Sequence, residues 1–124
     1  MPTPRHRIAV IENDPCVLEP LERLLTLFGL DVAPFLSAES YLESAATIGA
    51  SCLLIDIHLD GMSGLTLAST MVATGKPLPF ILMTASDDPE THRRAKASGC
   101  CAFLTKPFSG EQLEDALRKA DVPG

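Results

Sequence analysis

The sequence predicts an α/β domain with three layers, in which a doubly wound parallel sheet of five strands lies between two layers of helices. Five short apolar runs alternate strictly with five stretches that have apolar residues at helical spacing, the pattern of strands and crossover helices. Polar residues stand directly after most of these runs, where a parallel sheet places its functional groups. A chain of 124 residues that is 46% hydrophobic can bury such a sheet as one domain.

Residues 7–11 form the first predicted strand. Asp14 can cap the helix that follows, and Pro15 suits the first turn of that helix. Gly29 is expected to end it. Pro20 lies inside this helix, and we expect a kink or a late, irregular start there because proline lacks the backbone N–H that a helix uses.

Residues 31–36 form a weaker predicted strand, and Pro34 places this strand near an edge of the sheet, where a missing N–H is tolerated. Ser37 is the expected start of the second helix. Residues 52–55 are apolar throughout and predict a buried strand, and the third helix is expected over residues 65–73.

The second half of the chain continues the alternation. Strands are predicted over residues 79–84 and 101–105, with a helix over residues 88–99 between them. The last helix is expected over residues 109–120, because the residues SGEQ at its start form a capping box.

The chain is predicted to be one domain, residues 1–124, in which residues 6–121 fold and residues 1–5 and 122–124 are tails. The final letters DVPG fit equally well a tail or the start of a linker to another domain.

Composition excludes several classes of function. The formal net charge of -6 argues against direct binding to nucleic acid, because no basic stripe can replace the counterions around phosphates. No apolar run approaches the roughly 18 to 20 residues that cross a membrane, and no secretory signal is recognisable at the N-terminus. We therefore expect a cytoplasmic protein.

Four cysteines are present, and none forms a C-x-x-C pair or has zinc-ligand spacing. Their apolar neighbours predict small buried side chains in a reducing compartment. The alternative is an exposed reactive thiol at Cys16 or Cys100.

Polar residues at the ends of four predicted strands form the candidate site. Glu12 and Asn13 follow the first strand, Asp56 the third, Thr84 the fourth and Lys106 the fifth. Taken singly, each has an ordinary structural explanation: Asp56 as a cap, Thr84 as a β-branched strand residue, and Lys106 as a solvated residue before a turn. Together they would place carboxylates, a hydroxyl and an ammonium on one edge of the sheet.

At these positions the sequence resembles the receiver domains of bacterial two-component response regulators. The resemblance covers essentially the whole chain and rests on the ordered motifs IAVIENDP, LLIDIHLDGMSG, FILMTA and FLTKPF, with ASGCCAF before the last. It implies the flavodoxin-like arrangement of that family, in which five strand–helix units form the sheet.

The resemblance implies that Asp56 is the phosphoacceptor, whose carboxylate attacks the phosphohistidine of a partner kinase. Glu12 and Asn13 match the acidic pair that holds Mg²⁺ together with Asp56. The backbone carbonyl of His58 matches the remaining protein ligand. A divalent cation is expected because the transferring phosphoryl group carries dispersed negative charge.

The other matched residues surround the phosphoryl position. Thr84 would hydrogen-bond one phosphoryl oxygen and Lys106 would pair with another, while Pro107 matches a position that usually follows a cis peptide bond. Phe103 stands where the family keeps an aromatic that moves between exposed and buried rotamers. It is either such a switch residue, together with Thr84, or a plain core aromatic.

Three residues depart from the family pattern. Asn13 replaces the usual aspartate and brings no negative charge to the metal, so we expect weakened affinity for Mg²⁺. Asp60 replaces a usual proline and could restore some of that charge. His58 is either a residue that tunes loss of the phosphoryl group or a solvated loop histidine.

The predicted function is therefore phosphorelay signalling: a receiver domain that accepts a phosphoryl group on Asp56 from a sensor histidine kinase or phosphotransfer protein and does not act as a turnover enzyme. The alternative is a receiver-like interaction module with weak or absent phosphorylation because of Asn13. A phosphohydrolase of the haloacid dehalogenase type is disfavoured, because His58 stands where that family needs a second aspartate.

The output surface is expected on the fourth helix, fifth strand and fifth helix. A basic cluster on the fourth helix, formed by His92, Arg93, Arg94 and Lys96, is either a homodimer or effector contact or simply a solvated face. The segment PFLSAESYLES is similar to receivers that precede a helix-turn-helix domain, so both a transcriptional regulator and a stand-alone receiver fit the sequence.

Overall fold

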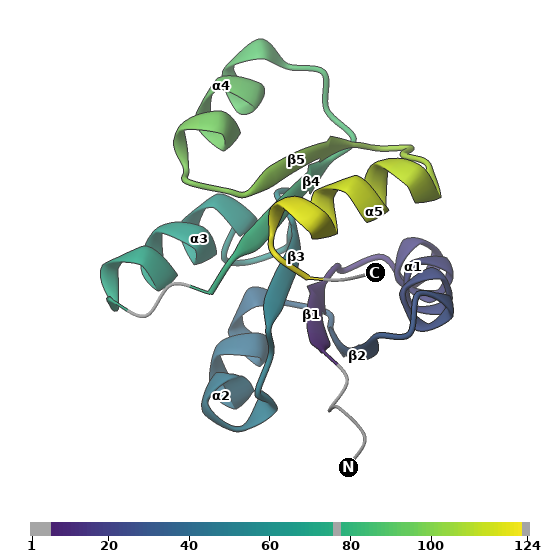
Figure 1. The fold of residues 1–124 in the computed structure, drawn as a ribbon. Helices are drawn as coiled ribbons and strands as arrows, with labels where there is room; N and C mark the ends of the chain where they lie inside the picture. The colour runs from purple at the N-terminus through teal and green to yellow at the C-terminus, as the bar shows by residue number, and fades with distance from the viewer. Residues whose placement is uncertain (1–5, 76–77, 123–124) are drawn as a thin grey trace.

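In the computed structural model, which describes residues 6–75 and 78–122, the chain forms one five-stranded parallel sheet with the strand order β2-β1-β3-β4-β5 (Figure 1). The strands are β1 (Arg7–Ile11), β2 (Asp31–Phe35), β3 (Cys52–Asp56), β4 (Phe80–Thr84) and β5 (Ala102–Thr105). The helices are α1 (Pro15–Leu27), α2 (Ala38–Ile48), α3 (Gly64–Ala73), α4 (Pro89–Ala97) and α5 (Gly110–Lys119). The doubly wound, three-layer fold is confirmed.

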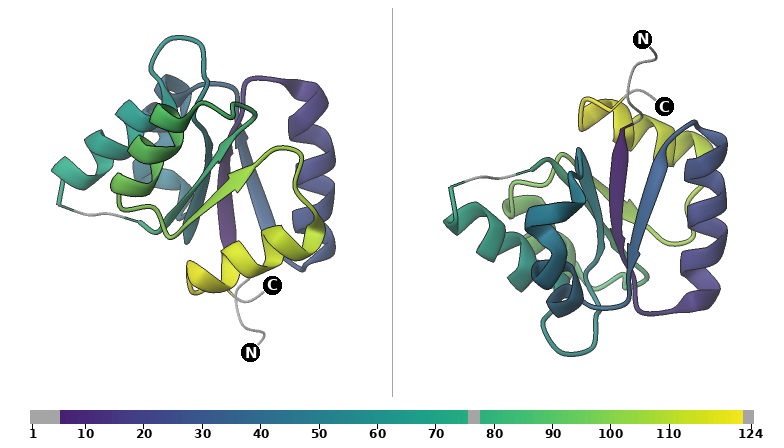
Figure 2. Two further views of the ribbon diagram at one scale, coloured as in Figure 1. Left: turned by 90° about the horizontal axis from the view of Figure 1, so that it is seen from above. Right: turned by 90° about the horizontal axis from the view of Figure 1, so that it is seen from below.

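Each face of the sheet has its own core. Helices α1 and α5 cover one face, where Leu21, Leu25 and Leu117 pack against Val10 and Leu54. Helices α2, α3 and α4 cover the other face, as the views from above and below show (Figure 2). The central strands β3 and β4 are buried along their whole length, as expected for strands covered on both sides. The carboxyl ends of these strands are therefore held rigidly.

The helix starts follow the predicted capping chemistry. The Asp14 side chain accepts a hydrogen bond from the Cys16 N–H at the start of α1, and Ser37 caps α2. Ser109 and Gln112 form the predicted capping box of α5. These caps satisfy N–H groups that have no partner inside the helix.

Of the two alternatives expected at Pro20, a kink or a late, irregular start of α1, the late start is wrong. The helix begins at Pro15 and includes Pro20. Pro20 and Cys16 are both exposed, so water can satisfy the Cys16 carbonyl that the missing N–H of Pro20 would have bonded. Gly29, with φ of 85°, follows the Phe28 cap, as predicted for a helix end.

The ends of the folded region differ slightly from the prediction. Val122 was expected in the C-terminal tail, but it is only 2% exposed and its N–H bonds the Leu117 carbonyl. The apolar side chain of Val122 completes the core beneath α5, so the fold extends one residue further. The predicted tails at 1–5 and 123–124 lie outside the described residues.

The cysteines are only partly as predicted. Cys52 is buried in β3, and burial raises the pKa of its thiol to about 12. Cys16 is exposed at the first turn of α1, while Cys100 and Cys101 are half-buried. All four are unpaired. Within residues 6–75 and 78–122, no helix is both long and apolar enough to cross a membrane.

Candidate functional site

The Lys106 ammonium joins two carboxylates that come from different strands. Its Nζ donates to Glu12 Oε1 and lies 3.2 Å from Asp56 Oδ2. Glu12 follows β1, Asp56 ends β3 and Lys106 follows β5, so the register of the parallel sheet brings the three together at one edge. The three charges predicted from separate motifs therefore form one cluster.

The two carboxylates are almost completely shielded from water. Glu12 is 1% exposed and Asp56 is 5% exposed. Burial raises the pKa of Glu12, and the nearby Asp56 raises it further, while the Lys106 ammonium opposes both effects. Keeping both acids ionised here is costly unless positive charge offsets them.

Asp56 is oriented by contacts to both of its oxygens. The His58 backbone N–H donates to Oδ1 at 3.1 Å, while Lys106 holds Oδ2. The chain then turns tightly, because the Gly64 N–H at the start of α3 bonds the Ile57 carbonyl at 3.0 Å. This turn brings Gly64 directly against the backbone of Asp56: a Cβ on Gly64 would lie 2.2 Å from the Asp56 carbonyl oxygen.

The loop after Asp56 is also tied to α2. Glu39, in the first turn of that helix, accepts a hydrogen bond from the Met62 N–H at 3.1 Å. Gly61 beside it has φ of 73°, a conformation that favours glycine. The acceptor loop therefore has fixed anchors on both sides.

Asn13 pairs with the residue that replaces the usual loop proline. Its amide Nδ2 donates to Asp60 Oδ2 at 3.2 Å. With the amide nitrogen turned to Asp60, the opposite oxygen of Asn13 is the atom left for other partners. The Asp60 carboxylate adds negative charge next to an otherwise uncharged side chain.

The donor set suits a hard divalent cation. The carboxylates of Glu12 and Asp56 and the amide oxygen of Asn13 are oxygen donors of the kind Mg²⁺ prefers. Within the described part of the chain, no three His, Cys, Asp or Glu side chains are grouped to hold a metal by themselves. Lys106 already binds the two carboxylates.

Thr84 is fully buried, and its hydroxyl has two partners. The His58 ring Nε2 lies 2.8 Å from Thr84 Oγ1, and the Ser86 N–H donates to the same oxygen at 3.0 Å. Sequence reasoning placed both His58 and Thr84 at this edge but missed their contact. The only signal was that both residues lie at the carboxyl ends of neighbouring strands.

Phe103 is half-buried in β5. The ring of His92, on α4, meets it edge to face, with 4.9 Å between centroids. His92 Nε2 also lies 2.7 Å from the Ser86 carbonyl oxygen. Phe103 thus contacts α4 through His92. The Lys106–Pro107 peptide bond is cis, in agreement with the resemblance.

An apolar groove of about 510 Å³ borders the charged cluster. Its walls come from α1, from the residue after β4 and from the segment after β5. They are formed by Val17, Pro20, Leu21, Leu24, Ala85, Lys106, Pro107 and Phe108. Lys106 belongs to both the groove and the site. A partner seated in the groove would therefore touch the edge where Asp56 lies.

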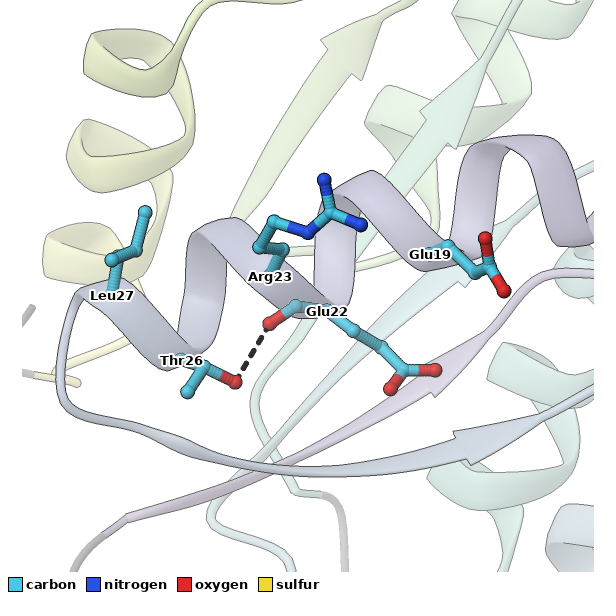
Figure 3. Close-up of a pocket in the computed structure, with 5 residues that line it drawn as sticks. All are labelled: Glu19, Glu22, Arg23, Thr26 and Leu27. Atoms are coloured by element: carbon cyan, nitrogen blue, oxygen red, sulfur yellow. Dashed lines mark hydrogen bonds between the residues drawn. The ribbon is translucent and has the colours of Figure 1, made fainter.

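A second hollow is unrelated to the strand ends. It lies along the solvent face of α1 and is lined by Glu19, Glu22, Arg23, Thr26 and Leu27 (Figure 3). The Thr26 hydroxyl donates to the Glu22 carbonyl of the same helix at 2.8 Å. All five side chains come from one helix, so this hollow is a gap between surface side chains.

The comparison with known families identifies the domain. Residues 8–118 match the model of the response regulator receiver domain. The chain belongs to this family. It is a receiver domain of the response regulators that act in two-component systems.

Curated relatives of this receiver domain include whole response regulators. The chain is 33% identical over 113 residues to the response regulator protein TmoT of Ectopseudomonas mendocina, covering 91% of this chain and 51% of TmoT. It is 30% identical over 123 residues to the transcriptional regulatory protein FixJ of Bradyrhizobium diazoefficiens, covering 96% of this chain and 60% of FixJ. The chain thus spans about half the length of the curated relatives that it matches.

Solved structures agree with the fold. The response regulator StyR superposes with a TM-score of 0.83 at 33% identity, covering 94% of this chain and 59% of StyR. The receiver domain of an HD domain-containing protein from Pseudomonas fluorescens Pf-5 gives a TM-score of 0.86 at 24% identity, with 94% of both chains covered.

We predict that Gly64→Ala destabilises the receiver domain by about 2 kcal/mol or more, because the added methyl group meets the Asp56 backbone and the packed turn must shift. Gly110→Ala is the matched control: Gly110 also begins a helix, but a Cβ there meets only Leu24 carbons at 3.8 and 3.9 Å. Urea unfolding of both variants measures the difference. Equal stabilities would contradict the close approach of Gly64 to Asp56.

Proposed function

We propose that this receiver domain accepts a phosphoryl group on Asp56 from a histidine kinase or phosphotransfer protein and changes its α4–β5–α5 surface in response. The observation that carries the proposal is the Lys106 ammonium between the buried carboxylates of Glu12 and Asp56. Such an edge supplies a nucleophile together with positive charge for the transferred group.

In the proposed reaction, a carboxylate oxygen of Asp56 attacks the phosphorus of a phosphohistidine. An O–P bond forms, the N–P bond breaks, and the imidazole leaves with the electron pair of that bond. Asp56 is held for this step by the His58 N–H on one oxygen and by Lys106 on the other. The domain is a stoichiometric acceptor in this scheme and not a turnover enzyme.

Glu12, Asn13 and Asp56 would hold Mg²⁺, with the His58 backbone carbonyl as a further ligand. The ion, when bound, offsets the negative charge of the phosphoryl oxygens and of the two buried acids. Lys106 then pairs with a phosphoryl oxygen, and Thr84 donates to another. Each of these residues already lies at the strand ends that surround Asp56.

The apolar groove between α1 and the segment after β5 is the proposed seat of the kinase. A helix that carries the phosphohistidine can cover apolar residues such as Leu21 and Leu24 while its histidine faces Asp56, because Lys106 is shared by the groove and the site. The unpaired cysteines suit the reducing cytoplasm, where such a kinase would meet the domain.

The proposed output is transcriptional. Relatives that share this receiver include proteins named as transcriptional regulators, and the chain matches only part of their length. Homodimerisation through α4, β5 and α5 is the proposed route to that output. Helix α4 carries cationic Arg94 and Lys96, and helix α5 carries acidic Glu114 and Asp115.

Incubation with Mg²⁺ and acetyl phosphate is predicted to add one phosphoryl group to the domain, and Asp56→Ala is predicted to abolish this gain. Intact-protein mass spectrometry measures the product. Asp87→Asn is the control, because Asp87 is an exposed carboxylate of the loop after β4 and should not affect the reaction. No adduct on the unaltered domain would instead support a receiver-like module that acts by protein contact alone.

Asn13→Asp is predicted to tighten Mg²⁺ binding about tenfold, on the order of 1.4 kcal/mol, because the new carboxylate supplies the charge that the amide lacks. Calorimetric titration with MgCl₂ gives the two dissociation constants. Thr26→Asp controls for net charge, since Thr26 lies on the solvent face of α1 (Figure 3). Equal affinities for the unaltered domain and the Asn13→Asp variant would contradict the assignment of this position to the metal.

A further inference from the structure

The Thr84 hydroxyl already has hydrogen-bond partners in this structure. The Ser86 N–H donates to Thr84 Oγ1 at 3.0 Å, and His58 Nε2 lies 2.8 Å from the same atom. A hydroxyl has a single proton to donate. Thr84 Oγ1 also has two acceptor lone pairs, so beside the Ser86 N–H it can either donate its proton to His58 Nε2 or accept one from it. Donation to His58 requires that the neutral ring carries its own proton on Nδ1.

We propose that His58 is a positioning residue that holds the Thr84 hydroxyl in the unphosphorylated domain. A phosphoryl group on Asp56 then gains the Thr84 hydrogen bond only by displacing the His58 ring. This inference rests on the proposed function, because it assumes that Thr84 donates to the phosphoryl group. The His58 ring and the phosphoryl group would then compete for the same Thr84 hydroxyl.

The position of His58 suits this competition. Its backbone N–H is bonded to Asp56 Oδ1 at 3.1 Å, so the residue that holds Thr84 is anchored to the phosphoacceptor. The contact joins the loop after β3 to the end of β4, across 26 positions of sequence. His58 is an exposed residue, so its ring can turn from Thr84 to water without leaving a buried nitrogen unpaired.

A series of contacts connects Thr84 to helix α4. Ser86, which donates to Thr84, presents its carbonyl to His92 Nε2 at 2.7 Å. A carbonyl only accepts, so this His92 nitrogen carries a proton. The His92 ring in turn packs against Phe103. Movement of the Thr84 hydroxyl therefore removes the acceptor of the Ser86 N–H and disturbs the segment that His92 and Phe103 share.

Beryllofluoride, a phosphoryl mimic that binds carboxylates, tests the competition in the presence of Mg²⁺. His58→Ala is expected to bind it about fivefold more tightly than the unaltered domain, as expected when one net hydrogen bond no longer has to be broken. In a Thr84→Val background, the same His58 substitution should give no gain. His6→Ala is the matched control, because His6 also contacts a hydroxyl, that of Ser51 at 3.2 Å, but precedes β1.

The ring nitrogens of His58 provide a second readout that needs no phosphoryl mimic. Nitrogen NMR of the free domain should show His58 with its proton on Nδ1 and with Nε2 accepting a hydrogen bond, and Thr84→Val should remove the signature of that bond. A proton on Nε2 in the free domain would overturn the proposal. So would equal beryllofluoride affinity in His58→Ala, or a gain that persists without the Thr84 hydroxyl.

The two ideas fail in different ways. If beryllofluoride binds the unaltered domain and His58→Ala equally well, the phosphoacceptor function stands and the role of His58 falls. If beryllofluoride binds none of the variants, the proposed function is overturned and the role of His58 falls with it. Tighter binding that depends on Thr84 supports both.

Discussion

The contact of Lys106 with Glu12 and Asp56 is the interaction on which the rest of the site depends. Two carboxylates that are 1% and 5% exposed would repel each other strongly at one strand edge without a nearby cation. The Lys106 ammonium lets both carboxylates stay buried in their ionised form. It also leaves them attracted to further positive charge, because two acids face a single lysine.

This constraint explains why the fold must be rigid around the acceptor. Asp56 ends a strand that is buried along its whole length, and Gly64 packs against its carbonyl with no room for a methyl group. The backbone of the acceptor is therefore fixed on the side of α3. After Asp56, exposed His58 contacts the buried Thr84 hydroxyl through its ring nitrogen.

The sequence predicted the fold and the members of the site because both follow from local patterns. Alternation of apolar runs with amphipathic stretches predicts parallel strands and crossover helices, and residues after those strands must meet at one edge. Asp14, Ser37 and Ser109 cap their helices as expected from their chemistry alone. The roles of Glu12, Asp56 and Lys106 came from the resemblance, and their convergence agrees with it.

The contacts that were missed are those between side chains that come from different segments. No spacing rule places the His58 ring against Thr84 or the Asn13 amide against Asp60, because both contacts depend on how separate loops pack. The late start of α1, one of the two alternatives considered at Pro20, is wrong because helix propensity penalises proline regardless of whether the turn faces water. Val122 was assigned to a tail because a short polar and proline-containing ending predicts one, whereas the core beneath α5 accommodates its side chain.

We propose that Lys106 and a divalent cation compete for the same two carboxylates, those of Glu12 and Asp56. Lys106→Met tests it most directly by urea unfolding with and without Mg²⁺, with Lys119→Met as the exposed control. Without Mg²⁺ the Lys106 variant should be less stable by about 3 kcal/mol, because two buried acids lose their counter-charge. Saturating Mg²⁺ should then stabilise this variant more than the unaltered domain. An equal or smaller effect of Mg²⁺ on the Lys106 variant would contradict this competition.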